Sequence, residues 1–335
     1  MSGWRYGLDE EERKLLEPAR HPEWTGPMLA TLTDKRFSDP DWLYERKLDG
    51  ERALAFRCGD RMRLMTRNAK QINSTYPELA EDLKAQDCRD FVVDGEIVAF
   101  EGNRTSFSRL QQRMQIRDEA EARDSGVPVY FYLFDILHLD GYRLDALTLR
   151  RRKALLKKVI TIHGRLRFTA HRNQDGERFF DEACEKGWEG LIAKAADAPY
   201  RHGRSHDWLK FKCTHGQELV IGGFTEPQGS RIGFGALLVG YYDDGALRYA
   251  GKVGTGYDDD FLARFRDRLD AISRKTSPFA DAVKEDQVTW VTPEIVGEFG
   301  FTEWTTAGRL RHPRFLGLRR DKQAGDVVRE RPGDS

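Results

Sequence analysis

The spacing of hydrophobic residues predicts a mixture of strands and helices over the first two thirds of the chain. Residues 42–56 (WLYERKLDGERALAF) alternate hydrophobic and polar positions at both ends, as strands do, around a polar centre. Further strands are predicted at 61–68, 91–100, 129–141, 189–195 and 207–213. Helices are predicted at 8–20, 76–87, 106–116, 148–160 and 178–188. We therefore expect an α+β domain in this part of the chain.

The pattern changes after about residue 214. Short strands separated by Gly or Asp-Gly turns fill residues 218–225, 235–254 and 287–305, and a single helix is predicted at 259–273. This spacing is typical of a small all-β barrel. We therefore expect three parts: an N-terminal extension at 1–24, the α+β domain at 25–214 and a β-barrel domain at 215–335.

Composition is that of a soluble protein with 335 residues, enough for two domains that each have a core. Apolar residues make up 39% and charged residues 33%, and no apolar run is long enough to span a membrane. The N-terminus lacks the apolar segment of a signal peptide. Cys58, Cys88, Cys184 and Cys213 are scattered, with no CxxC pair, which argues for a reducing compartment and against a zinc site. The cytoplasm is the expected location.

Charge is balanced overall, with 55 basic and 55 acidic residues, which by itself speaks against a nucleic-acid partner. Its distribution is uneven. Residues 150–168 hold eight Lys or Arg and no acid, and residues 309–320 hold five Arg and no acid. Either run alone is most simply a solvated helix face or loop. Together they favour a polyanionic partner.

The polar centre of residues 42–56 has two interpretations. Asp49-Gly50 between alternating hydrophobic residues is a strong hairpin signal, which would make Lys47 an ordinary hairpin residue. Alternatively, Lys47 lies at a strand end as a reactive amine, with Arg52 nearby to hold an anion. The residues that follow in the chain favour the second interpretation.

Charged or aromatic residues recur at the ends of the predicted strands. In chain order they are Arg67, Glu96, Phe134, Glu189, Lys210, Lys212, Arg311, Arg319 and Lys322. Lys210 and Lys212 share one face of their strand, because side chains in a strand repeat every two residues. Charges on buried strands are costly unless they meet at a site. A set of lysines, arginines and two glutamates would suit a nucleoside triphosphate with a divalent metal.

The order of these residues resembles that of the motifs of covalent nucleotidyltransferases. The matching stretches are Lys47-Leu48-Asp49-Gly50-Glu51-Arg52, Glu96, Phe134, EGLIAK at 189–194 and WLKFK at 208–212. The chain is most similar to ATP-dependent DNA ligases, and in particular to the ligase domain of bacterial ligase D, over roughly residues 25–325. The resemblance implies an adenylation domain of antiparallel sheets with flanking helices, followed by an OB-fold barrel.

The resemblance also implies a reaction. Lys47 would attack the α-phosphate of ATP and hold AMP; the AMP would pass to a DNA 5′-phosphate, and a 3′-hydroxyl would then displace it to seal the nick. Deprotonating a free lysine at pH 7 costs roughly 4–5 kcal/mol. We expect Lys210, Lys212 and a metal to lower that cost for Lys47 and to stabilise charge on the phosphates.

The resemblance and the residue chemistry together give each remaining residue a role. Glu96 and Glu189 would bind Mg²⁺ or Mn²⁺, with ribose as an alternative ligand for Glu96. Adenine would stack on Phe134 and meet Glu45 at its edge. The predicted phosphate and ribose clamps are Arg52, Arg67 and Arg204, with the 5′-phosphate of the nick as an alternative ligand for Arg67. The predicted pyrophosphate ligands are Arg311, Arg319 and Lys322.

Simpler interpretations remain for several of these residues. Phe134 could be a core aromatic, Glu45 a surface acid, and Lys210 and Lys212 part of a solvated strand face. Arg319 and Lys322 could belong to a general patch for the DNA backbone. At the level of function, the rivals are an RNA ligase, a GTP-dependent capping enzyme and a catalytically idle DNA-binding module.

The expected partner is nicked or broken double-stranded DNA. The basic run 150–168 and the barrel surface would share the contact, with affinity falling steeply as salt rises. The resemblance further implies end joining in the cytoplasm at the nucleoid, together with a Ku-like end-binding protein and a repair polymerase. We expect a monomer.

Overall fold

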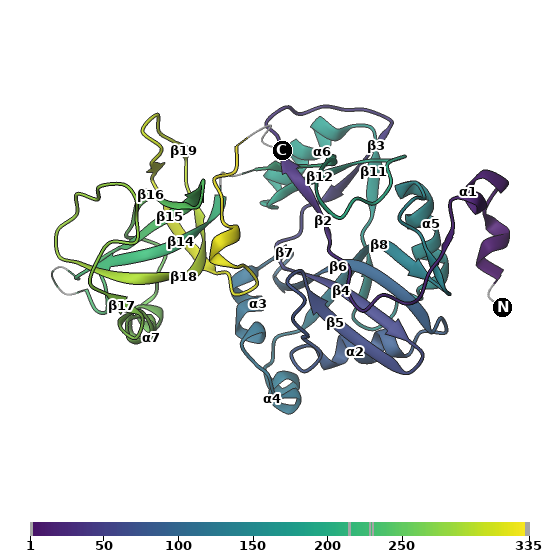
Figure 1. Cartoon of the computed structure of the whole chain (residues 1–335), viewed down its shortest axis with the longest axis horizontal. Coiled ribbons are helices and arrows are strands. Elements are labelled where there is room, and N and C mark those ends of the chain that lie inside the picture. The colour runs from purple at the N-terminus through teal and green to yellow at the C-terminus, as the bar shows by residue number, and fades with distance from the viewer. Residues whose placement is uncertain (1–2, 214–215, 228, 230, 332–335) are drawn as a thin grey trace. The chain divides into compact units, whose positions relative to one another are not determined.

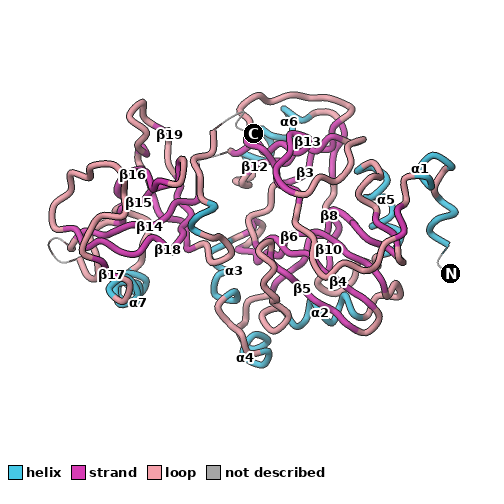
Figure 2. The backbone as a smooth tube through the Cα atoms, viewed as in Figure 1, coloured by secondary structure: helices cyan, strands magenta, loops and turns pink. Residues whose placement is uncertain are grey.

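A computed structural model of the chain describes residues 3–213, 216–227, 229 and 231–331, and it divides into two compact units (Figure 1). The first unit includes the chain up to Cys213, and the second is Thr214–Glu330. Strands dominate both units (Figure 2). Each unit is described by itself below.

The larger sheet of the first unit has eight strands, and most of its neighbours are antiparallel. Its main path runs in the order β1 (Glu17–Pro18), β9 (Tyr142–Arg143), β8 (Val129–Leu139), β6 (Asp90–Glu101), β4 (Glu51–Cys58) and β5 (Arg61–Thr66). β7 (Arg104–Thr105) pairs with β6, and β10 (Leu166–Phe168) pairs in parallel with β8.

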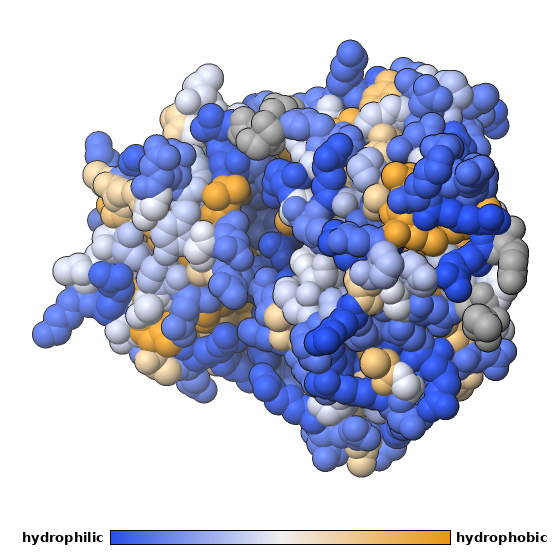
Figure 3. Space-filling view, turned by 45° about the vertical axis from the view of Figure 1, so that its right-hand side comes forward, coloured by the Kyte–Doolittle hydropathy of each residue, from blue (hydrophilic) through white to orange (hydrophobic). Residues whose placement is uncertain are grey.

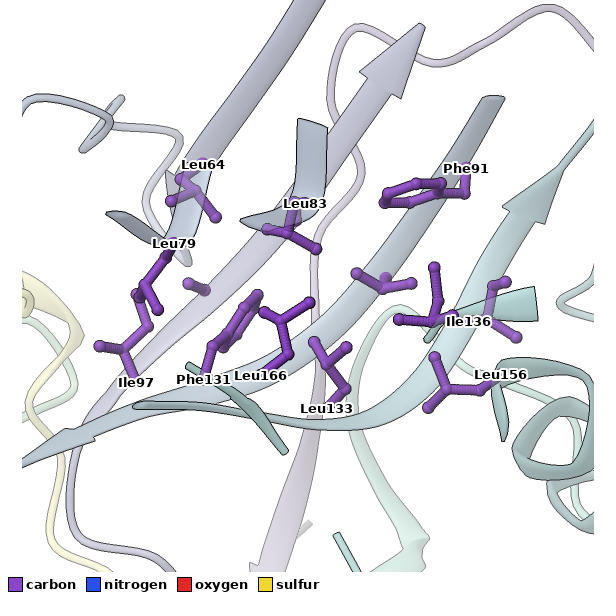
Figure 4. Close-up of a cluster of buried hydrophobic side chains, with 14 of the residues drawn as sticks. Leu64, Leu79, Leu83, Phe91, Ile97, Phe131, Leu133, Ile136, Leu156 and Leu166 are labelled. Carbon is purple, nitrogen blue, oxygen red and sulfur yellow. The ribbon is translucent and has the colours of Figure 1, made fainter. Parts of the chain in front are cut away.

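Helices pack on this sheet and close the main core, part of whose side chains Figure 4 shows. Leu79 and Leu83 come from α2 (Pro77–Lys84) and Leu156 comes from α5 (Leu149–Val159), and all three are buried with the sheet residues. α3 (Phe107–Met114) packs on β6, and α4 (Glu119–Asp124) packs on α2. The predicted helices 76–87, 106–116 and 148–160 are present, each slightly shorter than expected.

A second sheet of the first unit has five strands. Its order is β11 (His171–Asn173), β3 (Trp42–Arg46), β12 (Gly190–Ala195), β13 (Gly203–Lys212) and β2 (Met28–Leu32). β13 and β2 run parallel, and the other neighbours are antiparallel. Helix α6 (Gly176–Glu185) packs on β12 and β3, where its Phe179 and Phe180 join a second apolar cluster.

The hairpin interpretation of residues 42–56 is wrong. β3 belongs to the five-stranded sheet and β4 to the eight-stranded sheet, so the two strands do not pair. The chain crosses from one sheet to the other between β3 and β4, and Gly50 lies at this crossing. A Cβ atom on residue 50 would lie only 2.2 Å from the backbone oxygen of Ile97. The chain can therefore pass this closely between the sheets because residue 50 is glycine. Lys47 lies at the start of the crossing.

The N-terminal segment packs onto the first unit. Its helices are η1 (Gly3–Gly7) and α1 (Glu10–Lys14), which Asp9 caps at the N-terminus. Trp4 and Leu8 are buried in the main core. The helix predicted at 8–20 is shorter than expected because Pro18 follows, and a residue before proline disfavours helical geometry.

The second unit is built on a six-stranded antiparallel sheet. Its main path is β16 (Ala246–Val253), β15 (Leu237–Asp243), β14 (Gly216–Thr225), β18 (Val288–Gly300) and β17 (Ser273–Arg274), and β21 (Arg314–Leu318) also pairs with β18. The predicted helix is α7 (Asp259–Asp270), whose Leu262, Phe265 and Leu269 are buried. Smaller elements are β19 (Glu303–Trp304), β20 (Leu310–Arg311) and η2 (Ala324–Asp326).

The surface view in Figure 3 is mostly hydrophilic, with hydrophobic residues in small separate groups. Among the described residues, none of the helices combines the length and the apolar character needed to cross a lipid bilayer.

Candidate active site

Lys47 lies directly after β3 and forms an ion pair with Glu189, which directly precedes β12. The backbone N–H of Lys47 donates to the carbonyl of Gly190 at 2.9 Å, so the two segments are fixed to each other at this point. Both side chains are largely buried, with 19% and 24% of their surfaces exposed. The second Glu189 oxygen, Oε2, is buried and has no hydrogen-bond partner among the described residues.

The pKa of Lys47 differs from the expectation. Burial and the nearby Lys212 both act to lower this pKa, but the Glu189 carboxylate acts more strongly, and the pKa of Lys47 is raised. The effect of Lys212 thus has the predicted sign, but the net shift of the Lys47 pKa is upward. Its physical cause is the direct carboxylate partner, which stabilises the ammonium form.

Lys210 and Lys212 lie on β13, two residues apart and on one face. β13 pairs with β12, with Lys212 opposite Gly190 and Lys210 opposite Ile192. Gly190 has φ +147°, and a Cβ atom there would lie 1.9 Å from the Phe211 backbone oxygen. Only glycine fits this position, and it brings β13 close to the Lys47–Glu189 pair.

Glu45 is not a surface acid. It is buried and accepts hydrogen bonds from two buried lysines, Lys153 and Lys194, each at 2.6 Å. Burial acts to raise the pKa of Glu45, but the two ammonium groups lower it more. Burial lowers the pKa of Lys194 to about 8, although the Glu45 carboxylate opposes that shift. The cluster is thus a buried carboxylate shared by two lysines.

Phe134 lies next to this cluster. Its ring is 94% buried in a small apolar core and contacts Trp208 edge to face, with ring centroids 6.0 Å apart. The Lys194 Nζ atom lies 4.0 Å from the ring centroid, and the Arg52 guanidinium carbon lies 4.5 Å from it. Phe134 therefore has the environment of a core aromatic, and it also links Lys194 to Arg52.

Arg52 on β4 is held by Asp94 on β6 through two hydrogen bonds of 2.6 Å, from Nε and Nη2. The Asp94 carboxylate also accepts a 2.6 Å hydrogen bond from the Tyr200 hydroxyl. Burial acts to lower the pKa of Arg52, but Asp94 raises it more, so the guanidinium stays charged. To bind phosphate or ribose, Arg52 would have to use the guanidinium N–H groups that do not donate to Asp94.

The other predicted ligands of the first unit lie at strand ends or beside Arg52. Glu96 on β6 is half-buried and pairs with Arg52 across the antiparallel ladder. Arg67 is half-buried and follows β5. Arg204 on β13 is exposed and donates to the carbonyl of Ala30 at 2.9 Å.

The predicted pyrophosphate ligands all lie in the second unit and have acidic partners there. Arg319 pairs with Asp321 at 2.8 Å and with Glu298 at 3.2 Å, and its side chain is largely buried. Lys322 pairs with Glu218 at 2.9 Å, and Arg311 is exposed and pairs with Glu303. Arg319 and Lys322 thus stabilise their own unit, and contact with pyrophosphate or DNA would require exchange of these partners.

The basic run 150–168 is not a continuous DNA-binding surface. Arg152 is fully buried and paired with Asp135 at 2.7 Å, and Lys153 belongs to the Glu45 cluster. Arg151 pairs with Glu12 of the N-terminal segment. The exposed basic residues of α5 are Arg150, Lys157 and Lys158. Half of the charge that suggested a polyanion partner in this helix therefore has a structural role.

A disulfide joins Cys184, in α6, to Cys213, which follows β13. Their separation of 29 residues gives no sign of this bond in the sequence. The backbone N–H of Cys213 donates to the carbonyl of Glu189 at 3.0 Å, so the bond lies beside the segment that carries the Lys47 partner.

The predicted metal ligands fit a divalent cation in part. The buried, unpartnered Oε2 of Glu189 is a hard oxygen donor of the kind that Mg²⁺ and Mn²⁺ prefer. Among the described residues, however, Glu96 and Glu189 do not belong to a set of three closely spaced ligand side chains. A cation here would need further oxygen ligands, such as triphosphate oxygens and water.

Sequence reasoning missed two kinds of residue. Arg152 precedes Leu155, Leu156 and Val159 by three, four and seven positions, so helical periodicity places it on the apolar face, and this signal was available. Arg46 gave no such signal. Its guanidinium lies over the Trp188 ring, and its Nε and Nη2 atoms are buried without partners among the described residues. An anion such as phosphate would satisfy them.

Comparison with known proteins agrees with this arrangement. The ATP dependent DNA ligase domain matches residues 27–212, and the ATP dependent DNA ligase C terminal region matches residues 230–322. The chain is 37% identical over 322 residues to the multifunctional non-homologous end joining protein LigD of Pseudomonas aeruginosa, covering 93% of this chain and 37% of that protein. It is 32% identical to a DNA ligase of Methanoculleus marisnigri, covering 93% of this chain and 57% of that protein. The chain thus spans between about two fifths and three fifths of these relatives.

A solved structure shows the same fold. Mycobacterial DNA ligase D complexed with ATP and MES is 34% identical, with a TM-score of 0.64 over 91% of this chain and 98% of that one. The expected fold is confirmed: a nucleotidyltransferase domain of largely antiparallel sheets, followed by an OB-like domain. With both family domains matched in order, the chain belongs to the ATP-dependent DNA ligase family.

Proposed function

We propose that this chain seals DNA strands with ATP through a covalent lysyl-AMP intermediate on Lys47. The observation that carries the proposal is the Lys47–Glu189 pair between the two sheets, where one buried Glu189 oxygen has no hydrogen-bond partner in the described part of the chain. An amine held in a buried site beside further lysines is suited to attack on the α-phosphate. The match to ATP-dependent DNA ligases supports this interpretation.

The charges around Lys47 define what must change when ATP binds. Glu189 keeps the amine protonated and held in one place, so the nucleophile is stored in an inactive form. A divalent metal, when bound with ATP, would neutralise phosphate charge and compete for the Glu189 carboxylate. Release from Glu189 leaves Lys47 beside Lys212, which favours the neutral, nucleophilic amine. Lys210 and Lys212 are then placed to stabilise charge on the phosphates.

The adenosine part of ATP would bind at the cluster around Glu45 and Phe134. The buried hydroxyl of Thr169 lies beside this cluster, because the Thr169 carbonyl accepts a hydrogen bond from Lys153. That hydroxyl has no partner among the described residues, so a purine nitrogen could satisfy it. Stacking on Phe134 would displace at least one of the cations that lie over its ring. Arg52, Arg67, Arg204 and Glu96 remain proposed ligands of ribose and phosphate, and Arg311, Arg319 and Lys322 of pyrophosphate.

The proposed substrate is nicked or broken double-stranded DNA, and the proposed role is end joining at the nucleoid in the cytoplasm, as a monomer. Relatives named for non-homologous end joining support this role. A Ku-like protein and a repair polymerase are the proposed partners.

The first experiment is incubation with ATP or GTP that carries a radioactive α-phosphate, with Mg²⁺ or Mn²⁺, followed by denaturing electrophoresis. Wild type is compared with Lys47→Ala and Lys47→Arg. The arginine variant is the matched control, because it keeps a cation beside Glu189 but lacks a nucleophilic amine. We expect label from ATP on wild type alone. Label on either variant would assign the nucleophile elsewhere.

The substrate is then tested with nicked DNA and nicked RNA duplexes. Sealing of DNA supports the proposal. Sealing of RNA alone would make the chain an RNA ligase, and label from GTP alone would indicate a capping enzyme. If folded wild-type protein that is not already adenylated takes no label from either nucleotide, the enzymatic proposal fails.

A further inference from the structure

A cluster of two histidines and an aspartate lies in the first unit and shares no residue with the candidate active site. His21 Nδ1 lies 2.8 Å from Asp90 Oδ1, and His138 Nε2 lies 3.2 Å from the same oxygen. These ligand atoms all lie within 4.8 Å of one another, and the described part of the chain holds no other such set of three.

The fold fixes this arrangement through the large sheet. Asp90 begins β6 and His138 lies near the end of β8, and the register that pairs Val92 with His138 places both side chains on one face. The Asp140 backbone N–H donates to the Asp90 carbonyl at 2.9 Å, which holds the two strand ends together. His21 comes from the segment before β2 and packs edge to face on His138, with ring centroids 5.1 Å apart.

We propose that His21, Asp90 and His138 bind a divalent transition-metal ion of the zinc class. Two imidazoles and a carboxylate are a common ligand set for such ions. With metal–nitrogen distances of about 2.0–2.1 Å, a tetrahedral site needs ligand atoms about 3.3 Å apart. The two contacts to Asp90 Oδ1 are already close to that separation. The two imidazole nitrogens lie within 4.8 Å of each other, so binding needs side-chain rotation that sets them at the same spacing.

The surroundings allow an ion to enter and leave a position for water. The Asp90 side chain is 30% exposed, whereas His138 is almost fully buried. The Asp90 carboxylate lies within contact distance of both imidazoles.

The expected metal affinity depends on the ring nitrogen of each histidine that does not face Asp90. His21 Nε2 and His138 Nδ1 are buried and have no partner among the described residues. With a metal on the near nitrogens, each far nitrogen would carry a buried, unsatisfied N–H, and such outer contacts typically change metal affinity by about 10–100-fold. We therefore expect micromolar binding. One metal would join the N-terminal segment to β6 and β8, so binding should stabilise the unit.

The test uses the full chain, stripped of metal with a chelator and titrated with Co²⁺ and then Zn²⁺. We expect one Co²⁺ per chain with the visible absorption of a low-coordinate site, displaced by Zn²⁺. Asp90→Asn and His138→Gln should weaken binding by at least about 10-fold. Zn²⁺ should also raise the melting temperature of wild type but not of these variants. His21→Gln is the second variant, because His21 is less buried and its replacement is less disruptive to the core.

Two further variants separate this site from other metal sites. Glu189→Gln should keep the Co²⁺ spectrum, because it alters only the candidate active site. Cys58→Ser should also keep it, because Cys58 is an exposed thiol that could bind zinc adventitiously. Circular dichroism reports whether each variant is folded. The proposal is overturned if folded Asp90→Asn and His21→Gln bind Co²⁺ like wild type, or if Cys58→Ser alone loses binding. It is also overturned if wild type binds the metal only with a dissociation constant weaker than micromolar.

Discussion

The buried pair of Arg152 and Asp135 gives the sharpest test of which basic residues support the fold. Both side chains are fully buried, and Arg152 donates to Asp135 through Nε at 2.7 Å and Nη2 at 3.1 Å. The same guanidinium also donates to the carbonyls of Leu147 and Ala198. Asp135→Asn keeps the shape of the side chain but leaves the Arg152 charge without a carboxylate in the protein interior.

The expected loss is large because a buried charge cannot recover its hydration. Removing one partner of a buried ion pair typically costs about 3–5 kcal/mol. For a unit of this size, that corresponds to a fall in melting temperature of roughly 6–20 °C. Arg152→Met should cost a similar amount, because it leaves Asp135 unpaired. The double variant should recover part of the loss, because it removes both charges and keeps much of the volume.

The assay is urea denaturation of the single and double variants, combined with DNA binding over a series of salt concentrations. The matched control replaces Lys157 and Lys158, exposed residues of the same helix, with alanine. This control should change stability by no more than about 0.5 kcal/mol, and any phosphate contact would appear as a smaller salt slope. An Arg152→Met protein that keeps its stability but loses DNA affinity would refute the structural role of Arg152.

Three further predictions follow from buried or constrained residues. The pKa of Lys194 is about 8 in the folded chain and about 10.5 in the unfolded chain. Between these pH values only the unfolded chain keeps the proton, so the free energy of unfolding should rise by roughly 3 kcal/mol. This rise should disappear in Lys194→Met. Equal pH slopes in the two proteins would contradict it. Gly190→Ala should destabilise the first unit and abolish label on Lys47, because a Cβ atom would clash with backbone; a folded, fully labelled variant would show that the strand can shift. Reducing the Cys184–Cys213 bond should lower the free energy of unfolding by about 3–4 kcal/mol, because the unfolded chain regains the entropy of the closed loop. Cys58→Ser should not change it. Melting curves recorded with and without reductant test both expectations.

Much of the fold was predictable because each element has a local signal. The apolar run in residues 129–139 and the helical periodicity in residues 149–159 correspond to β8 and α5 within a few residues. The partnership of the strands was not predictable in the same way. Asp49-Gly50 has the local chemistry of a hairpin, but the close approach of Gly50 to the Ile97 backbone belongs to a crossing between two sheets. Local pattern identifies a strand, and only tertiary contacts choose its neighbours.

The candidate site shows the same division. The sequence identified Lys47 and Glu189 as important, and the structure brings them into contact. It could not show that Lys194 and Lys153 would both pair with Glu45, because these lysines lie far from Glu45 in the chain and Lys153 is part of a run that looks solvent-exposed. The sign of the Lys47 pKa shift was also beyond sequence reasoning, since it depends on which charge is nearest.

The raised pKa of Lys47 has a consequence for how the proposed reaction would be controlled. In the proposed reaction, pairing with Glu189 would favour the ammonium form of Lys47, which is not nucleophilic, while ATP is absent. The same carboxylate has a buried, unpartnered oxygen, so a cation that binds there would compete directly with Lys47 for Glu189. In the proposed reaction, Glu189 would hold either the amine or the cation, because both use one carboxylate. The ion pair would then link activation of Lys47 to the binding of the metal with its nucleotide.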